Sequence, residues 1–136
     1  RPFMSPAKAK VLLIDDEPSI VKFVGKRLEV EGYDVLLALD GQDGLDKART
    51  QQPDLIILDL MLPKLSGFEL CATLKQDPQH QQIPIIVYTA RGQETDKICR
   101  DCGADAVIHK TPTNEGLLER VKTLLAGSSR SPAPPQ

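Results

Sequence analysis

Acidic, hydroxyl and ammonium side chains follow four of the five short apolar runs in this chain. Residues 11–14, 55–58, 85–88 and 106–109 are followed by Asp15 with Asp16, by Asp59, by Thr89 and by Lys110, respectively. The remaining run, residues 35–38, is followed by no such group. If the runs are parallel strands, these side chains converge on one sheet edge, where open α/β sheets bind ligands. The sequence therefore predicts one site built from five distant residues.

The residue types at this predicted site suit phosphoryl transfer. Asp15, Asp16 and Asp59 would repel one another unless a cation neutralised them, and hard carboxylate oxygens suit Mg²⁺. A carboxylate can also attack phosphorus and form an aspartyl phosphate. Asp59 is the candidate, because it should end the central strand. Lys110 and Thr89 supply the ammonium and hydroxyl that a transferred phosphoryl group needs on its oxygens.

Taken singly, these residue types also have common structural roles that involve no chemistry. Acids that follow a strand often cap a helix or remain solvated, and a single lysine is usually a surface residue. The functional hypothesis therefore depends on all five occurring together at strand ends.

The rest of the chain alternates apolar runs with amphipathic segments. Strands are predicted over residues 11–14, 35–38, 54–58, 83–88 and 106–109. One helix is predicted from Pro18 to a stop at Gly32, and others over residues 41–52, 67–76, 93–102 and 114–125. Continuous Val, Ile and Leu runs are typical of strands covered by helices on both faces. The predicted fold class is doubly wound α/β, a five-stranded parallel sheet flanked by five helices.

Length and composition indicate one globular domain. The 136 residues suffice for one core, with 40% hydrophobic and 26% charged residues. No apolar run approaches the roughly 18 residues of a membrane span. The net charge of -2 provides no basic field for nucleic acid, so neither direct nucleic-acid binding nor membrane insertion is expected.

Three segments are predicted along the chain. Residues 1–9 form a disordered or vector-derived segment that contains Met4, and residues 10–126 form the domain. Residues 127–136 form a Pro/Ser-rich tail or linker.

The cysteines indicate a reducing, cytoplasmic environment. Cys71, Cys99 and Cys102 are odd in number and no signal peptide precedes them. Cys99 and Cys102 have the spacing of a redox or zinc pair, but no second Cys/His pair completes a zinc site. The pair is also expected in the middle of a helix, so we interpret the cysteines as ordinary buried residues.

Five separated motifs resemble those of the receiver domain of bacterial two-component response regulators. They are residues 13–18 (LIDDEP), 54–63 (DLIILDLMLP), 66–67 (SG), 84–90 (PIIVYTA) and 103–105 (GAD), the last followed by Lys110. The resemblance covers residues 10–126 and implies a flavodoxin-like fold with strand order 2-1-3-4-5.

The resemblance also implies a role for each matching residue. Asp59 matches the phosphoacceptor, Asp15 and Asp16 match the acidic Mg²⁺ pair, and Met61 matches the position whose backbone carbonyl completes the metal shell. Thr89 matches the switch hydroxyl and Lys110 the phosphate-binding lysine.

Three positions depart from the family pattern. Val107 replaces an aromatic residue that usually reports phosphorylation, Thr111 replaces the proline that usually follows the lysine, and Ala106 replaces an acid typical of DNA-binding subfamilies. We therefore expect a monomer or weak dimer, with sedimentation unchanged by a phosphate mimic.

The leading hypothesis is a signalling module, not an enzyme apart from its own phosphorylation and dephosphorylation. It would accept phosphate on Asp59 from a histidine kinase or phosphotransfer protein and act on an unknown downstream protein or a covalently linked output domain. An alternative is a degenerate receiver that acts as a phosphorylation-independent scaffold. An aspartate-nucleophile phosphatase would have an Asp-x-Asp motif at its nucleophile. The second position after Asp59 is Met61, which argues against this class. A nucleotide-binding module would need a glycine-rich phosphate loop that this chain lacks.

Overall fold

Five parallel strands form one sheet in the computed structural model, which describes residues 8–90 and 94–127. The strands are β1 (Lys10–Ile14), β2 (Asp34–Ala38), β3 (Leu55–Leu58), β4 (Ile85–Thr89) and β5 (Ala106–His109). Their order is β2-β1-β3-β4-β5, so β3 is central, as predicted. Most of the two predicted end segments, residues 1–9 and 127–136, falls on residues 1–7 and 128–136, which lie outside the described residues.

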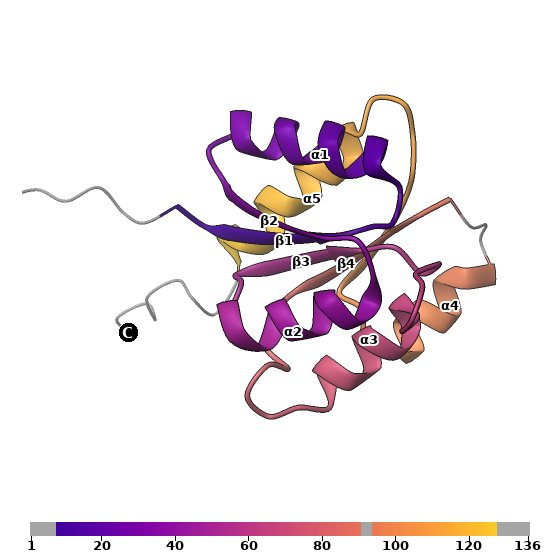
Figure 1. Ribbon diagram of the computed structural model, residues 1–136. Coiled ribbons are helices and arrows are strands. Elements are labelled where there is room, and N and C mark those ends of the chain that lie inside the picture. Colours follow the sequence, from indigo (N-terminus) through magenta and orange to yellow (C-terminus); the bar gives the residue numbers. More distant parts are fainter. Residues whose placement is uncertain (1–7, 91–93, 128–136) are drawn as a thin grey trace, which may run out of the picture.

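Helices cover both faces of this sheet. They are α1 (Pro18–Val30), α2 (Gly41–Gln51), α3 (Gly67–Lys75), α4 (Glu94–Asp101) and α5 (Glu115–Ala126). Helices α1 and α5 lie on one face and α2, α3 and α4 on the other (Figure 1). The predicted doubly wound α/β fold and its strand order are confirmed. Across residues 8–90 and 94–127, no helix is long and apolar enough to cross a membrane.

The core has two parts because alternate strand residues face opposite sides of the sheet. Leu12 and Ile56 belong to the cluster that includes residues of α2 and α3, whereas Val11 and Ile57 belong to the cluster that includes residues of α1 and α5. All four side chains are fully buried. Burial on both faces explains the uninterrupted aliphatic sequence of the inner strands.

Several predicted boundaries are off by one residue, and the start of β4 is off by two. The strand expected from residue 83 begins at Ile85 instead. Pro84 has no N–H to donate to a ladder, which accounts for the later start. Cys102 was expected in the middle of a helix, but α4 ends at Asp101. Cys71, Cys99 and Cys102 are buried and form no disulfide, as expected for ordinary buried residues. That the Cys99–Cys102 pair has no redox or zinc role stays a prediction.

The turn after β3 brings α3 close to the end of that strand. Ser66 caps α3 by accepting a hydrogen bond from the backbone N–H of Glu69, whose side chain in turn accepts from the backbone of Ser66. The backbone N–H of Gly67 donates to Leu60 O at 3.0 Å. A Cβ at Gly67 would lie 2.0 Å from the carbonyl oxygen of Asp59, so only glycine fits there.

Candidate functional site

Backbone hydrogen bonds hold three of the predicted residues at the edge formed by the carboxyl ends of the strands. Each continues a strand ladder by one residue: Asp15 N donates to Ala38 O at 3.1 Å, Asp59 N to Ile14 O at 3.1 Å, and Lys110 N to Thr89 O at 2.9 Å. The main chain of Asp15, Asp59 and Lys110 is therefore fixed by the sheet itself. Their side chains leave from β1, β3 and β5 at the carboxyl ends of the strands.

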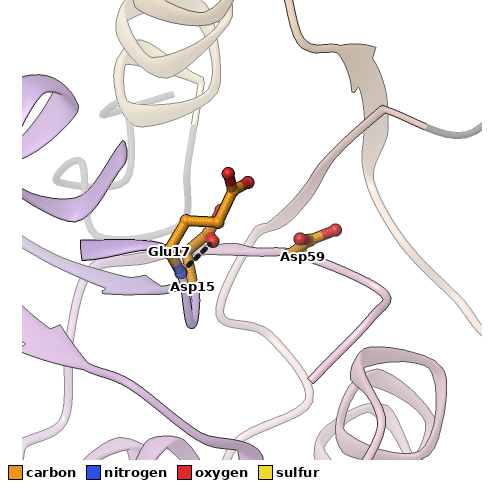
Figure 2. Close-up of side chains that lie close together, drawn as sticks. All are labelled: Asp15, Glu17 and Asp59. Atoms are coloured by element: carbon orange, nitrogen blue, oxygen red, sulfur yellow. Dashed lines mark hydrogen bonds between the residues drawn. The ribbon is translucent and has the colours of Figure 1, made fainter. Parts of the chain in front are cut away.

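Three carboxylates meet at this edge. One oxygen from each of Asp15, Glu17 and Asp59 lies within 4.8 Å of the other two (Figure 2). Asp15 and Asp59 are buried, whereas Glu17 is exposed. The backbone N–H of Glu17 donates to Asp15 Oδ1 at 3.0 Å, which shapes the loop between β1 and α1.

The ammonium of Lys110 contacts all three of these acids. Its Nζ lies 2.9 Å from Asp15 Oδ2, 3.1 Å from Glu17 Oε1 and 3.2 Å from Asp59 Oδ2. One positive charge therefore faces three carboxylates, and the group keeps an excess of negative charge when all are ionised. An anionic site of this kind favours binding of a further cation.

Burial and pairing shift two pKa values at the site. Burial raises the pKa of Asp15 above its usual 3.8, against the opposing effects of the Glu17 N–H and of Lys110. Burial alone would lower the pKa of Lys110, but its hydrogen bond to Asp15 and the charges of Asp59 and Asp15 raise it overall. Lys110 therefore stays protonated and provides a permanent positive charge beside Asp59.

The other predicted site residues, Thr89, Met61 and Asp16, differ in how deeply they are buried. Thr89 is fully buried at the end of β4, the strand next to β3. The backbone N–H of Met61 is 3.5 Å from Asp59 Oδ1, and its side chain is exposed. Asp16 is exposed and lies outside the group of three carboxylates. A role for Asp16 or for the Met61 carbonyl in binding metal stays a prediction.

Sequence reasoning missed Glu17. It is the N-cap of α1, with extended backbone angles and no side-chain bond to the helix, so its carboxylate can reach Lys110. The signal in the sequence was an acid directly before Pro18, because proline at a first helical position leaves the preceding side chain outside the helix.

The residues present fit a divalent cation. Carboxylate oxygens from two strand ends and a loop are the hard ligands that Mg²⁺ selects, and the group carries more negative than positive charge. Asp15 and Asp59, with the predicted Asp16 and Met61 carbonyl, would hold it.

Comparison with known proteins agrees with this geometry. The model of the response regulator receiver domain family matches residues 11–122. The chain is 46% identical over 124 residues to a DNA-binding dual master transcriptional regulator, RpaA, of Synechocystis sp., covering 90% of this chain and 52% of that protein. It is 45% identical over 120 residues to the alkaline phosphatase synthesis transcriptional regulatory protein PhoP of Bacillus subtilis, covering 88% of this chain and 49% of that one.

Solved structures show the same fold. The chemotaxis response regulator CheY4 of Vibrio cholerae superposes with a TM-score of 0.81 at 32% identity, covering 87% of this chain and 99% of that one. The response regulator TrrA of Thermotoga maritima, solved in complex with Mg²⁺ and BeF, gives 0.77 at 31% identity, covering 85% and 98%. The chain spans about half the length of the curated relatives it matches. This chain belongs to the response regulator receiver domain family.

Proposed function

We propose that the chain accepts a phosphoryl group on Asp59, in a Mg²⁺-dependent reaction, from a histidine kinase or phosphotransfer protein. The observation that carries the proposal is the contact of Lys110 Nζ with the carboxylates of both Asp59 and Asp15 at the carboxyl edge of the sheet. A buried nucleophile with a fixed ammonium beside it is the arrangement that phosphoryl transfer requires.

In this reaction, one oxygen of Asp59 attacks the phosphorus of a phosphohistidine. The P–N bond breaks, and its electron pair stays on the imidazole nitrogen. Lys110 neutralises charge on the phosphoryl oxygens, and Thr89 offers its hydroxyl from the neighbouring strand. Bound Mg²⁺ would supply further neutralisation of those oxygens. The chain catalyses only its own phosphorylation and dephosphorylation.

The experiment is intact-mass measurement after incubation with acetyl phosphate. Wild-type protein should gain one phosphoryl group with Mg²⁺ and none with EDTA. Asp59→Asn should gain none, because the amide that replaces the carboxylate is not a nucleophile. Asp34→Asn removes an exposed acid at the start of β2 and should behave as wild type. Phosphorylation that persists in Asp59→Asn would contradict the assignment of Asp59.

The output of the module is also part of the proposal. Relatives of which this chain covers about half are named as transcriptional regulators. This supports a signal that passes to a downstream protein or to a covalently linked output domain. Phosphorylation would change a protein-binding surface. We propose a cytoplasmic location, supported by three cysteines that form no disulfide.

Self-association is expected to be weak. Receiver domains usually have an aromatic residue three positions before the lysine. In this chain that position holds Val107, which is half-buried in β5. Sedimentation should be equal with and without a phosphate mimic. Tight dimerisation on activation would contradict this expectation.

A further inference from the structure

Tyr88 places a buried aromatic ring beside the ammonium of the site. It lies in β4, one residue before Thr89, and is 1% exposed. In the β4–β5 register Tyr88 pairs with Ile108, so Lys110 is diagonally opposite on the same face of the sheet. Lys110 Nζ lies 5.9 Å from the centroid of the Tyr88 ring, within the reach of a cation–π attraction.

The path of the Lys110 side chain explains why a neighbour on β4 matters. Lys110 follows the edge strand β5, and Asp59 follows β3, two strands away. Adjacent strands lie about 4.8 Å apart, so roughly 10 Å in the plane of the sheet separates the main chains of Lys110 and Asp59. The side chain therefore passes over the end of β4, where Tyr88 lies. The carboxylates hold the ammonium at its end, and a surface along this path would restrict the flexible four-carbon chain that leads to it.

The ring is itself fixed at its far end. The Tyr88 hydroxyl donates a hydrogen bond to Asn114 Oδ1, and Asn114 is buried directly before α5. The backbone N–H of Asn114 in turn donates to Thr111 Oγ1 at 3.2 Å. The ring also belongs to the core cluster that contains Leu117 of α5. Burial raises the pKa of Tyr88, so its hydroxyl keeps the proton that it donates.

We propose that Tyr88 is a positioning residue for phosphoryl transfer: its ring, held by Asn114, directs the ammonium of Lys110 toward Asp59. The inference rests on the proposed function. Thr89 is one residue further along β4 and faces the opposite side of the sheet from Tyr88. The two neighbours would therefore have separate tasks, one at the lysine and one at the phosphoryl group.

The test compares the rates of phosphorylation of three variants by acetyl phosphate with saturating Mg²⁺. Tyr88→Leu removes the ring and should lower the maximal rate by about 3- to 30-fold, the range of a cation–π contact. Tyr88→Phe keeps the ring but removes its hydrogen bond to Asn114, so its rate should lie between those of Tyr88→Leu and wild type. Ile86→Ala is the control, because Ile86 is fully buried in the same strand and core cluster but is two residues further from the site.

A spectroscopic measurement covers the case in which Tyr88→Leu does not fold. The chain has two tyrosines and no tryptophan, so Tyr33→Phe leaves Tyr88 as its one tyrosine emitter. Addition of Mg²⁺ and BeF₃⁻, a phosphoryl mimic, should draw Lys110 to the mimic and change the Tyr88 fluorescence. The same addition to Tyr33→Phe/Lys110→Met, where binding is monitored by ¹⁹F NMR, should leave the fluorescence unchanged.

Three results would overturn the inference. They are equal rates for Tyr88→Leu and wild type, an equal loss of rate in Ile86→Ala, and unchanged Tyr88 fluorescence when BeF₃⁻ binds. Failure of the proposed function itself is distinguishable, because wild-type protein would then gain no phosphoryl group at all.

Discussion

Lys110 Nζ lies 3.2 Å from Asp59 Oδ2, although 51 residues separate the two in the chain. The same ammonium lies 2.9 Å from Asp15. One side chain that follows the edge strand β5 thus holds together acids that follow β1 and β3. These acids would otherwise repel each other, so Lys110 contributes to the stability of the metal-free fold as well as to the chemistry of the site.

Replacement of Lys110 by methionine should destabilise the metal-free protein. The change leaves two nearly buried carboxylates without their shared donor, and hydrogen bonds to charged groups are worth about 1.5–3 kcal/mol. We expect the free energy of unfolding in EDTA, measured by urea titration, to fall by an amount in this range. Mg²⁺ should reduce the deficit because it supplies another cation. Lys47→Met, which breaks an exposed pair with Asp43, should change stability by less than about 1 kcal/mol.

A second prediction contrasts two glycines. In Gly67→Ala the new Cβ would meet the Asp59 carbonyl, so the backbone at the phosphoacceptor must shift. We expect a loss of about 1–3 kcal/mol and slower phosphorylation. In Gly25→Ala, within α1, the Cβ meets Leu37 at an ordinary 3.5 Å. That variant should gain about 0.5–1 kcal/mol from better helix propensity. Equal unfolding midpoints for the two variants would contradict the close approach at Gly67.

The expectation that residues following parallel strands converge on one edge of the sheet was enough to predict that Asp15, Asp59 and Lys110 lie together. The sheet carries their backbones to one edge whatever the surrounding side chains are, so their meeting follows from the fold class. Glu17 and Tyr88 could not be found in this way. Glu17 reaches Lys110 from a loop, and the link from Tyr88 to Asn114 depends on where α5 begins. Such contacts depend on side-chain directions that spacing alone does not specify.

Exposure along β2 was also beyond the sequence pattern. Residues 35–38 read as a continuous apolar run, typical of a strand buried on both faces, yet Leu37 is exposed, as is Leu39 directly after the strand. The reason is the position of β2 at the edge of the sheet, where less of the protein surrounds the strand. Strand order therefore decides burial here, and composition does not reveal it.

The cysteines should be inert in the folded protein. Cys71 and Cys99 are fully buried, and Cys102 is 6% exposed. Burial raises the pKa of Cys71, which keeps it as the unreactive thiol. A thiol reagent such as DTNB should react with all three cysteines in urea, and at least 10-fold more slowly without denaturant. Fast reaction of even one thiol in the native protein would argue for a redox role of the Cys99–Cys102 pair.

Asp77 joins two segments on the side of the sheet that carries α2 and α3. Its Oδ2 lies 2.7 Å from Nδ1 of the buried His80, and its Oδ1 accepts a hydrogen bond from the backbone N–H of Gln79 at 3.0 Å. The Nε2 atom of His80 lies 3.3 Å from the side-chain nitrogen of Gln52, just after α2. The pair thus ties the turn after α3 to the end of α2.

This pair should make stability depend on pH through Asp77. The hydrogen bonds from Gln79 and His80 lower the pKa of Asp77 below its usual 3.8. A lowered pKa in the folded state stabilises the protein above the unfolded pKa, and this contribution is lost as pH falls through the folded value. Asp77→Asn should therefore unfold at lower urea concentration than wild type near pH 7, with the difference shrinking below about pH 3.8. Asp34→Asn serves as the control and should lack this pattern; a difference for Asp77→Asn that is constant from pH 7 to pH 3 would contradict the assignment.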